Sequence, residues 1–527
     1  MTAAGYVRGG PAALRPDAGV GGGAGTATAR SPLDGVADLA VRAPWGAPVL
    51  LTLALGCYQI GRPELWRDEV SSWSFAARPV SGLIATARNT GATQLAYYLL
   101  LHFWIGAFGD SADAMRALSV LAMAGAAACV TLVGRKLAGT RVGVASGLVF
   151  ALVPSVSRFA QEARFYALEV LVATLATLLL LRALERPSWP RWLAYAAVVA
   201  FLGYVDLVAL SVVAGHAVGV ALRWRQDRDR RHLRFIPAAA AGLAACVPLA
   251  VIGWAQAGDQ VNWILRPGLD LGAFTFFAWN LFYSTSVAAA LIVLAVLAWA
   301  AARREAAFPT AIAVVPVAVV WLVSQGPHSY FFPRYLLLTV GAWAILAGIA
   351  LSRLDARIAV AVLAVIALLG AGDQQSVRAA GAHSWPTYPA ASDGAYLDYA
   401  GAAAIIAREA RAGDGIVYEF KGWSRPMLIG TGVRYFLGQD LRPGVPLPRE
   451  LFVKETATRA DTLYDVECRH PARCIGQEPR IWIVGWRDLT NSGQAITPAQ
   501  AALLRRLHYR RVFRAHVSGL TLSLIHI

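Results

Sequence analysis

The chain has 527 residues, of which 57% are hydrophobic and only 15% are charged. An ordinary soluble domain carries about 25% charged residues, so this composition excludes a soluble enzyme and a disordered chain. The formal net charge is +16, but the basic residues lie in short clusters between long apolar runs. This pattern excludes a nucleic-acid binder with one basic face and is typical of a polytopic membrane protein.

The first 42 residues are rich in glycine and alanine and lack apolar periodicity, so we expect a disordered cytoplasmic tail there. After this tail come apolar segments near the length of about 20 residues that an α-helix needs to cross the hydrocarbon core. We predict eleven spans, at 43–60, 117–134, 142–157, 166–183, 192–205, 207–222, 236–254, 276–300, 308–324, 335–351 and 357–372.

A further apolar segment, Leu95–Phe108, has only fourteen residues, a length typical of an interfacial or re-entrant segment. If it does not span, the basic loops at 135–141, 182–191, 223–234, 303–304 and 353–357 share one side and carry 16 lysines and arginines. Basic residues of short loops favour the cytoplasmic side. We therefore predict a cytoplasmic-membrane protein with its amino terminus inside, residues 95–108 flat on the outer surface and the carboxyl terminus outside.

This topology leaves two large segments outside the cytoplasm, the loop 61–116 and the tail 373–527. The tail is more polar, and its runs Gly415–Phe420 and Arg480–Trp486 are typical of strands. A helical stretch at 498–507 and β-like runs near 511–525 follow. We therefore expect an extracytoplasmic α/β domain of about 150 residues after a transmembrane domain at 43–372.

Two of the five cysteines, Cys468 and Cys474, lie together in the tail. A zinc site would have only His470 between them and no second cysteine pair. A local disulfide in an oxidising exterior is the favoured interpretation.

Ionisable residues at membrane depth or at span ends are costly, so each is a candidate for function. The first set follows span one and contains Arg67, Asp68 and Glu69. Two adjacent acids beside an arginine could supply a general base for an attacking hydroxyl. The alternative is a solvated turn whose acids cap the next helix.

The second set lies between spans three and four and contains Glu162, Arg164, Tyr166 and Glu169. At 3.6 residues per turn, positions 162, 166 and 169 share one helix face, which would put Glu169 one turn inside the bilayer. A structural ion pair that joins two span ends is the alternative.

The third set contains His328, Arg334 and Tyr335, at the outer end of span ten. An arginine fork with a neighbouring tyrosine suits a phosphate group; an interfacial anchor is the alternative. Asp206, in the turn between spans five and six, is more typical of an N-cap than of a catalyst. The sequence contains no phosphate-binding glycine loop and no nucleotide-binding fingerprint.

Four strings give the chain a family resemblance: WRDEVSSW, YYLLLHFWIGAFGDSADAMRALS, RFAQEARFYALEVL and FFPRYLLL. Together they resemble the bacterial protein-O-mannosyltransferase-like glycosyltransferases, family 39 of the GT-C superfamily, over roughly residues 60–350. The resemblance implies a GT-C-like polytopic α-helical membrane protein, and such enzymes generally carry an extracytoplasmic domain; the tail itself has no clear likeness to the family, so its α/β character is expected from its own sequence.

The resemblance also implies a function. Such enzymes move a sugar from a polyprenyl-phosphate carrier to an acceptor hydroxyl, with inversion of the anomeric centre. Mannose is the first choice of sugar, because it is the sugar typical of the family. The catalytic base maps to Asp68 with Glu69 beside it, and Arg164 and Arg334 map to the residues that hold the lipid phosphate. Many relatives have a proline before the YYLL string, where this chain has Gln94-Leu95-Ala96. This difference leaves the shape of the acceptor side open, so the acceptor can be a glycolipid, a polysaccharide or a protein.

We therefore predict Asp68 and Glu69 as catalytic, and a wider set as substrate-binding: Arg67, Glu162, Arg164, Tyr166, His328, Arg334 and Tyr335. The two adjacent acids could bind a divalent cation, but their spacing does not demand one. The predicted partners are the donor lipid, the acceptor and membrane lipid, with no nucleic acid. The alternative function is a transporter or flippase of a lipid-linked sugar. Transporters tend to have inverted repeats and charges near the middle of the bilayer, whereas this sequence shows no internal repeat and its charges lie at the outer rim.

Overall fold

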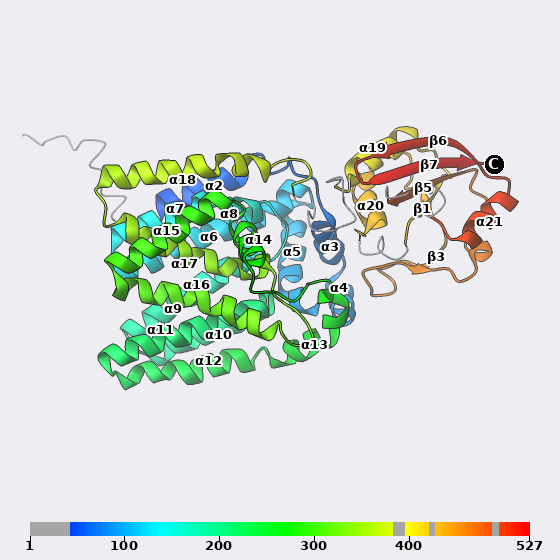
Figure 1. The fold of residues 1–527 in the computed structure, drawn as a ribbon. Coiled ribbons are helices and arrows are strands. Elements are labelled where there is room, and N and C mark those ends of the chain that lie inside the picture. Colours follow the sequence, from blue (N-terminus) through cyan, green and yellow to red (C-terminus); the bar gives the residue numbers. More distant parts are fainter. Residues whose placement is uncertain (1–42, 383–395, 421–426, 487–494) are drawn as a thin grey trace, which may run out of the picture. The chain divides into compact units, whose positions relative to one another are not determined.

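The computed structural model describes residues 43–382, 396–420, 427–486 and 495–527. The predicted disordered tail, residues 1–42, lies outside the described residues, as does a part of the predicted outer domain. Most of the chain before residue 383 is helical (Figure 1). The elements of this part are α2 (Gly46–Cys57), α3 (Arg67–Ala76), α4 (Val80–Asn89), η1 (Ala92–Gln94), α5 (Leu95–Phe108), α6 (Ala112–Ala138), α7 (Thr140–Leu152), α8 (Pro154–Ala160), α9 (Tyr166–Glu185), α10 (Trp189–Val205), η2 (Val208–Ser211), α11 (Val212–Asp227), η3 (Arg230–Arg234), α12 (Phe235–Ala244), α13 (Val247–Val261), α14 (Leu271–Phe282), α15 (Thr285–Ala301), α16 (Arg303–Val323), η4 (Pro333–Thr339), α17 (Val340–Leu351) and α18 (Ala356–Ser376).

Each of the eleven predicted spans falls on helices. Within the described residues, five helices are long and apolar enough to cross a membrane, and the number rises to eight if each of three bent pairs counts as one span. The helices α2, α10 and α11 have only 12, 17 and 16 residues. The predicted count of eleven spans therefore stays a prediction. The fourteen-residue helix α5 is likewise shorter than these five, and the expectation that it does not span stays a prediction.

One of the bent pairs positions part of the candidate site. Helices α7 and α8 meet at an angle of 66°. Pro154 is the first residue of α8 and has no N–H to continue α7, and Val153 before it is extended, with ψ of 124°. The short helix α8 and the loop after it consequently lead residues 158–165 back across the end of the bundle.

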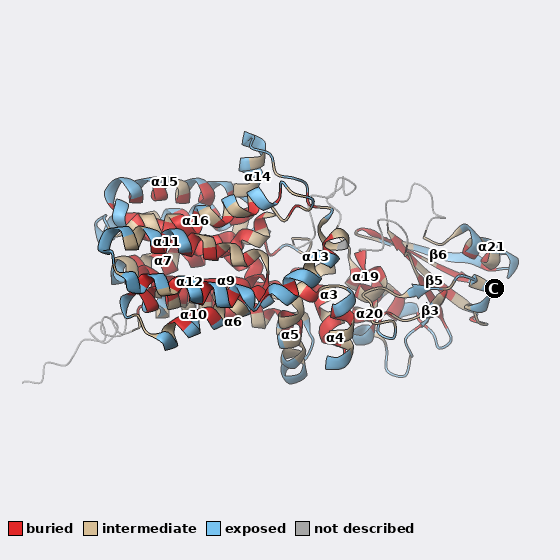
Figure 2. Cartoon of the chain, turned by 90° about the horizontal axis from the view of Figure 1, so that it is seen from below, coloured by how far each residue is buried: buried red, intermediate tan, exposed pale blue. Residues whose placement is uncertain are grey.

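The bundle has its core around α6, which packs against α2, α7, α9 and α17. Figure 2 shows buried residues along the interior helices and exposed residues along α12, α14 and α15. Many exposed residues are large and apolar, such as Val293 and Val296 on α15 and Val360 and Leu368 on α18. Exposed apolar faces of this extent fit a bundle with lipid as its surroundings.

The remaining elements form a small α/β domain, with two short strands paired separately. They are α19 (Tyr399–Glu409), β1 (Gly415–Tyr418), α20 (Ile429–Asp440), β2 (Arg449–Glu450), β3 (Val453–Glu455), β4 (Val466–Glu467), η6 (Pro471–Arg473), β5 (Arg480–Trp486), α21 (Pro498–Arg506), β6 (Arg510–Val517) and β7 (Leu520–His526). The main sheet has the order β2-β1-β5-β7-β6, in which β2, β1 and β5 are parallel and β7 is antiparallel to both neighbours.

The strands and the helix predicted from the sequence of this domain are confirmed. The β-like run near 511–525 divides into β6 and β7 at Gly519, which has φ of +67°, a conformation that glycine adopts without strain. Helix α21 begins after Thr497, whose hydroxyl accepts a hydrogen bond from the backbone N–H of Gln500.

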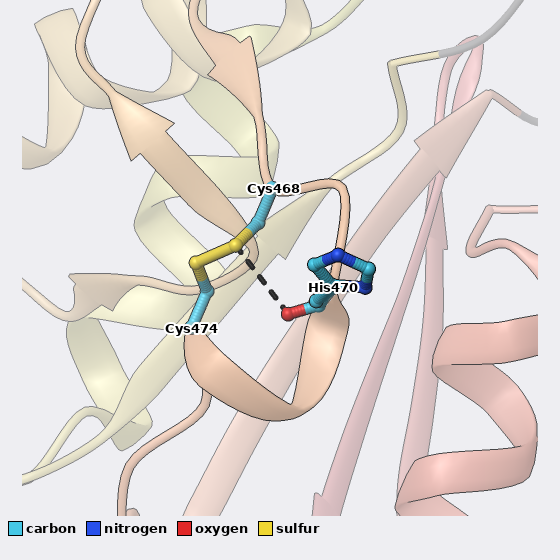
Figure 3. Close-up of a disulfide and its surroundings, with 3 residues drawn as sticks. All are labelled: Cys468, His470 and Cys474. Atoms are coloured by element: carbon cyan, nitrogen blue, oxygen red, sulfur yellow. Dashed lines mark hydrogen bonds between the residues drawn. A yellow bond between two sulfur atoms is a disulfide. The ribbon is translucent and has the colours of Figure 1, made fainter.

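The predicted disulfide is also present in this domain. Cys468 and Cys474 are bonded across a Cα–Cα distance of 6.4 Å. The carbonyl oxygen of His470 lies 3.5 Å from Sγ of Cys468, and its imidazole points away from the two sulfur atoms (Figure 3). The zinc alternative is therefore excluded for this pair.

Candidate active site

The candidate site is built around the first turn of α3, where two adjacent acids have different environments. Successive residues of a helix are rotated by about 100°, so Asp68 and Glu69 point in different directions. The side chain of Asp68 is 15% exposed, whereas that of Glu69 is fully buried.

Glu69 is held by a buried bidentate ion pair. Arg116 of α6 donates from Nε to Oε1 and from Nη2 to Oε2, both at 2.8 Å. The backbone N–H of Ala163 donates a further hydrogen bond of 2.9 Å to Oε1. Arg116 also donates to the carbonyl oxygens of Ile60 and Pro63. Glu69 thus joins α3, α6 and the loop after α8.

Asp68 lies instead among guanidinium groups from separate parts of the chain. Its Oδ1 is 3.2 Å from Nε of Arg67, and its Oδ2 is 3.4 Å from Nη1 of Arg334. Burial by itself raises the pKa of Asp68, but the charges of Arg67, Arg164 and Arg334 outweigh it and hold the pKa below the ordinary value. Asp68 is therefore a carboxylate at neutral pH.

Arg334 is surrounded by aromatic rings. Its guanidinium carbon lies between 5.1 and 5.8 Å from five ring centroids, a distance at which the ring faces attract a cation. The rings belong to Trp66, Tyr166, Trp263, Phe332 and Tyr335. They fix the position of Arg334 beside Asp68.

Arg164 approaches α3 from the loop before α9. Its Nη1 lies 3.5 Å from the backbone oxygen of Asp68, 3.4 Å from Oγ of Ser72 and 3.5 Å from the hydroxyl of Tyr98. The Tyr98 hydroxyl donates a 2.6 Å hydrogen bond to Oε1 of Gln94. Gln94 therefore holds the hydroxyl of Tyr98 beside Arg164.

Glu162 pairs with an arginine that the sequence analysis did not assign to it. Nη1 of Arg158 donates to Oε2 at 2.7 Å, and Nε1 of Trp66 donates to Oε1 at 2.9 Å. Glu162 is fully buried. Burial raises the pKa of Glu162, and the positive charge of Arg158 offsets a part of this rise. These contacts agree with the alternative interpretation of this segment, in which an ion pair has a structural role between two span ends.

Tyr166 is buried against Arg334 and Tyr335, with its ring centroid 6.3 Å from that of Tyr335. His328 has different neighbours: its Nδ1 lies 3.3 Å from Oδ1 of Asn262, and its ring is 5.5 Å from that of Trp254. In the described part of the chain, no contact joins His328 to Asp68.

The remaining expectations concern capping and metal binding. Oδ1 of Asp206 accepts a 3.1 Å hydrogen bond from the backbone N–H of Val208, but Asp206 is not the N-cap of η2, because that position belongs to Leu207. Asp68 and Glu69 do not fit a shared divalent cation, because Arg116 occupies both oxygens of Glu69. Among the residues that the structure describes, no group of three or more histidines, cysteines or acids could hold a metal ion.

Sequence reasoning did not single out Trp263, Tyr98 or Arg116. Aromatic residues are ordinary at membrane surfaces, so Trp263 and Tyr98 give no signal of their own. Arg116 lies between an acidic loop and a long apolar run, where an arginine is equally ordinary. Their contacts with residues distant in the chain reveal their roles.

Comparisons with known proteins agree with this architecture. Residues 94–254 match the family model of dolichyl-phosphate-mannose-protein mannosyltransferase. The fold is similar to that of ArnT from Cupriavidus metallidurans bound to undecaprenyl phosphate (TM-score 0.55, 14% identity, 91% of this chain and 97% of that chain covered). It is also similar to ArnT in the apo state (TM-score 0.57, 15% identity, 94% and 98% covered).

The archaeal oligosaccharyltransferase AglB from Archaeoglobus fulgidus has a lower similarity, with a TM-score of 0.42 and 11% identity over 80% of this chain and 64% of that chain, which supports no conclusion. The sequence matches no curated protein. The resemblance inferred from the sequence is confirmed to this extent: residues 94–254 match the mannosyltransferase family model, and the fold is similar to that of ArnT.

Proposed function

We propose that this protein is an inverting glycosyltransferase that moves a sugar from a polyprenyl-phosphate carrier to an acceptor hydroxyl at the outer face of the cytoplasmic membrane. The observation that carries the proposal is the meeting of the Asp68 carboxylate with Arg334 and Arg164, from three separate segments of a GT-C fold. The similar ArnT of Cupriavidus metallidurans binds undecaprenyl phosphate. Mannose is the first donor sugar to test, because of the family that matches residues 94–254.

Asp68 is the general base of the proposed reaction. Its carboxylate accepts the proton of the acceptor hydroxyl as the hydroxyl oxygen attacks the anomeric carbon from the face opposite the phosphate. The bond between the anomeric carbon and the phosphate oxygen breaks, and its electron pair leaves with the polyprenyl phosphate. One new glycosidic bond forms with inverted configuration.

Arg334 and Arg164 bind the phosphate and stabilise the charge that grows on it as the bond breaks. A guanidinium matches two phosphate oxygens with parallel N–H donors, and little is lost in ordering it because the rings already hold Arg334 in place. The isoprenoid tail of the carrier can stay in the lipid beside the exposed apolar helices, so no nucleotide needs to enter the site.

The two acids of the first loop have different roles in this proposal. We assign the proton transfer to Asp68 alone and assign Glu69 a structural role, because Glu69 is fully buried and both its oxygens accept from Arg116. Glu162, with Arg158 and Trp66, has a positioning role beneath Arg334.

The location at the outer face rests on the charge bias of the loops. Contacts between the loop 61–116 and the carboxyl-terminal domain support their placement in one compartment. Nη2 of Arg78 donates a 2.6 Å hydrogen bond to the carbonyl oxygen of Thr462, and Nδ2 of Asn89 donates one of 2.9 Å to that of Asp461. The hydroxyl of Tyr435 donates to the carbonyl oxygen of Asp110 at 2.8 Å.

The test is an assay of purified protein with polyprenyl-phosphate mannose, arabinose and galactose, in the presence of a membrane extract as acceptor source. We expect release of free polyprenyl phosphate with one of these donors, and loss of this release in Asp68→Asn. Asp113→Asn, which removes an exposed acid of the same loop, is the matched control and should retain it. Full release by Asp68→Asn would refute the assignment of the base. Movement of the intact donor lipid across vesicles without release would favour a flippase.

A further inference from the structure

The carboxyl-terminal domain, as far as the structure describes it, has a pocket whose lining residues are all distinct from those of the proposed active site. The pocket lies at the carboxyl end of β1, and residues of β2 and of the first turns of α20 and α21 also line it. Its volume is about 50 Å³. A cavity needs about 10 to 15 Å³ to hold one water, so this pocket has room for several non-hydrogen atoms, such as one edge of a sugar ring.

The strand order places this pocket where α/β sheets commonly bind ligands. From β1 the chain continues through α20 to β2, whereas from β5, on the other side of β1, it continues through α21 to β6 and β7. Two neighbouring parallel strands whose connections leave in opposite directions have a crevice at their carboxyl ends, and ligands of open α/β sheets bind in such crevices.

The two helices of these connections lie on opposite faces of the sheet. Val417 and Ile481 pack in one core with Leu504 of α21. The alternating residues Ile416 and Trp482 belong to the other core, which includes residues of α19 and α20. The first turns of α20 and α21 therefore reach the same edge of the sheet from its two faces.

Glu450, at the end of β2, supplies a buried oxygen to this pocket. Its Oε1 accepts from Nη2 of Arg434 on α20 at 2.7 Å, whereas its buried Oε2 has no hydrogen-bond partner among the described residues. Burial raises the pKa of Glu450 to about 7, despite the charge of Arg434. Protonation removes the charge but leaves the oxygen without a hydrogen bond, so a ligand with a hydroxyl group lowers the cost in either form.

The lining also contains a second acid and two aromatic rings. Oδ1 of Asp465 accepts from the backbone N–H of Ala457 at 2.6 Å, and its Oδ2 lies 3.4 Å from Nη2 of Arg434. The rings of Phe420 and Tyr464 meet edge to face, with 6.2 Å between their centroids. The negative face of an aromatic ring attracts weakly positive C–H groups, which a sugar ring carries beside its hydroxyl groups.

The charge of the pocket selects against other ligands. Four of its described lining residues are acids, namely Glu419, Glu450, Asp465 and Glu467, and Arg434 compensates only a part of their charge. A phosphate or a carboxylate would therefore be repelled. A metal ion also fits poorly, because no group of three or more histidines, cysteines or acids in the described chain could hold one.

We propose that this pocket binds a saccharide without acidic groups, with a hydroxyl of the sugar ring hydrogen-bonded to Oε2 of Glu450. A sugar hydroxyl donates and accepts, so it matches the carboxyl group in its ionised and in its protonated form. Water can occupy the same position but offers no C–H face to Phe420 and Tyr464. The domain thus has a glycan site of its own, which goes beyond the proposed sugar transfer and does not depend on it.

The test measures the binding of four sugars to the full-length protein by saturation-transfer difference NMR. The probes are the methyl glycosides of mannose, galactose and arabinose, and glucosamine. The detergent must lack a sugar headgroup, because an alkyl glycoside would compete for the pocket. At least one sugar should give a saturable signal, and ethanolamine, an amine without a sugar ring, should not displace it.

Two variants alter the pocket in different ways. Glu450→Met keeps the length of the side chain but has no oxygen, and Arg434 keeps Asp465 as a partner. This variant should weaken binding about tenfold or more, the effect of losing a hydrogen bond to a charged group. Thr431→Phe fills the pocket from the first turn of α20 and should abolish binding. The midpoint of thermal unfolding identifies the folded variants, and a folded one of the two is sufficient for the test.

Two control variants should bind the sugar as the wild type does. Glu409→Gln removes an acid at the opposite edge of the sheet, where the carbonyl oxygen of Glu409 accepts from Arg480 at the start of β5. Asp68→Asn removes the proposed base. The proposal is overturned if no sugar binds to the wild type, if ethanolamine displaces it, if a folded pocket variant binds as tightly as the wild type, or if a control loses binding. Because the readout is binding without a donor lipid, the outcome is independent of whether sugar transfer is found.

Discussion

Arg116 and Glu69 form a fully buried bidentate ion pair, whereas Asp68, the residue before Glu69, keeps a partly exposed carboxylate 3.4 Å from Arg334. The adjacent acids therefore differ in what their removal should do. Glu69 contributes to the stability of the fold, because without it the charge of Arg116 stays buried and uncompensated. Asp68, in the proposed function, acts as the base of the reaction.

We expect Glu69→Gln to destabilise the protein by about 3 to 5 kcal/mol, the cost of breaking a buried ion pair by removing one partner. Asp68→Asn should change stability far less, since that side chain is partly exposed. Thermal unfolding of both variants in the same detergent measures the difference. Equal midpoints for the two variants would contradict the division of roles.

Trp263 should matter for the affinity of the phosphorylated carrier, because its ring centroid lies 5.8 Å from the Arg334 guanidinium. A desolvated cation–π contact is worth about 1 to 2 kcal/mol, so Trp263→Ala should weaken carrier binding by about 5- to 30-fold. Trp254→Ala is the control, because Trp254 is exposed and contacts His328. Titration of polyprenyl phosphate against both variants checks the prediction, and an unchanged Kd in Trp263→Ala would count against it.

The pH dependence of the reaction follows from the lowered pKa of Asp68. Because three arginines hold this pKa below the ordinary aspartate value of about 3.9, Asp68 stays ionised through pH 5 to 8 and causes no loss of rate there. Its contribution to stability is present above the unfolded-state pKa and is lost as the pH falls through the folded-state pKa. Removal of a nearby cation should raise the folded-state pKa.

Arg67→Gln should therefore move the acidic limb of the profile of kcat/KM against pH to a higher pH than in the wild type. The same profile for Arg62→Gln, an exposed arginine of the loop, should not move. A limb that stays in place in Arg67→Gln would show that another group controls it.

The disulfide closes a short loop, because Cys468 and Cys474 are separated by six positions in the sequence. On the loop-entropy model, we expect its loss in Cys468→Ser to cost about 2 kcal/mol. Urea unfolding of the full-length protein, followed by the fluorescence of its tryptophans with and without reductant, measures this cost. Cys57→Ser replaces an exposed free thiol and should have no effect under either condition.

The predicted topology is open to thiol labelling in intact cells, in a background with Cys57 replaced by serine. A cysteine in place of Leu100, on the exposed side of α5, should react with a membrane-impermeant reagent, and a cysteine in place of Arg228 should react only after permeabilisation. Labelling of the residue-228 cysteine from outside would overturn both the charge argument and the location of the proposed site.

Local patterns in the sequence were sufficient for the class of the protein and for most of its elements. Long apolar runs have one stable outcome in lipid, because a helix satisfies its own backbone hydrogen bonds, so the predicted spans fall on helices. The strand-like runs at 480–486 and 511–525 likewise became β5, β6 and β7. The short spacing between Cys468 and Cys474 was enough to indicate their disulfide.

Only the tertiary structure decided which ionisable residues meet. Asp68 and Arg334 are separated by more than half of the chain, and the sequence offers no periodicity that fixes such a distance. The same holds for Glu69 with Arg116 and for Trp263 over Arg334. Whether an acid is partly exposed or fully enclosed depends on the ion pair that joins α3 to α6 and on the turn at Pro154, and these contacts give two neighbouring carboxylates different environments.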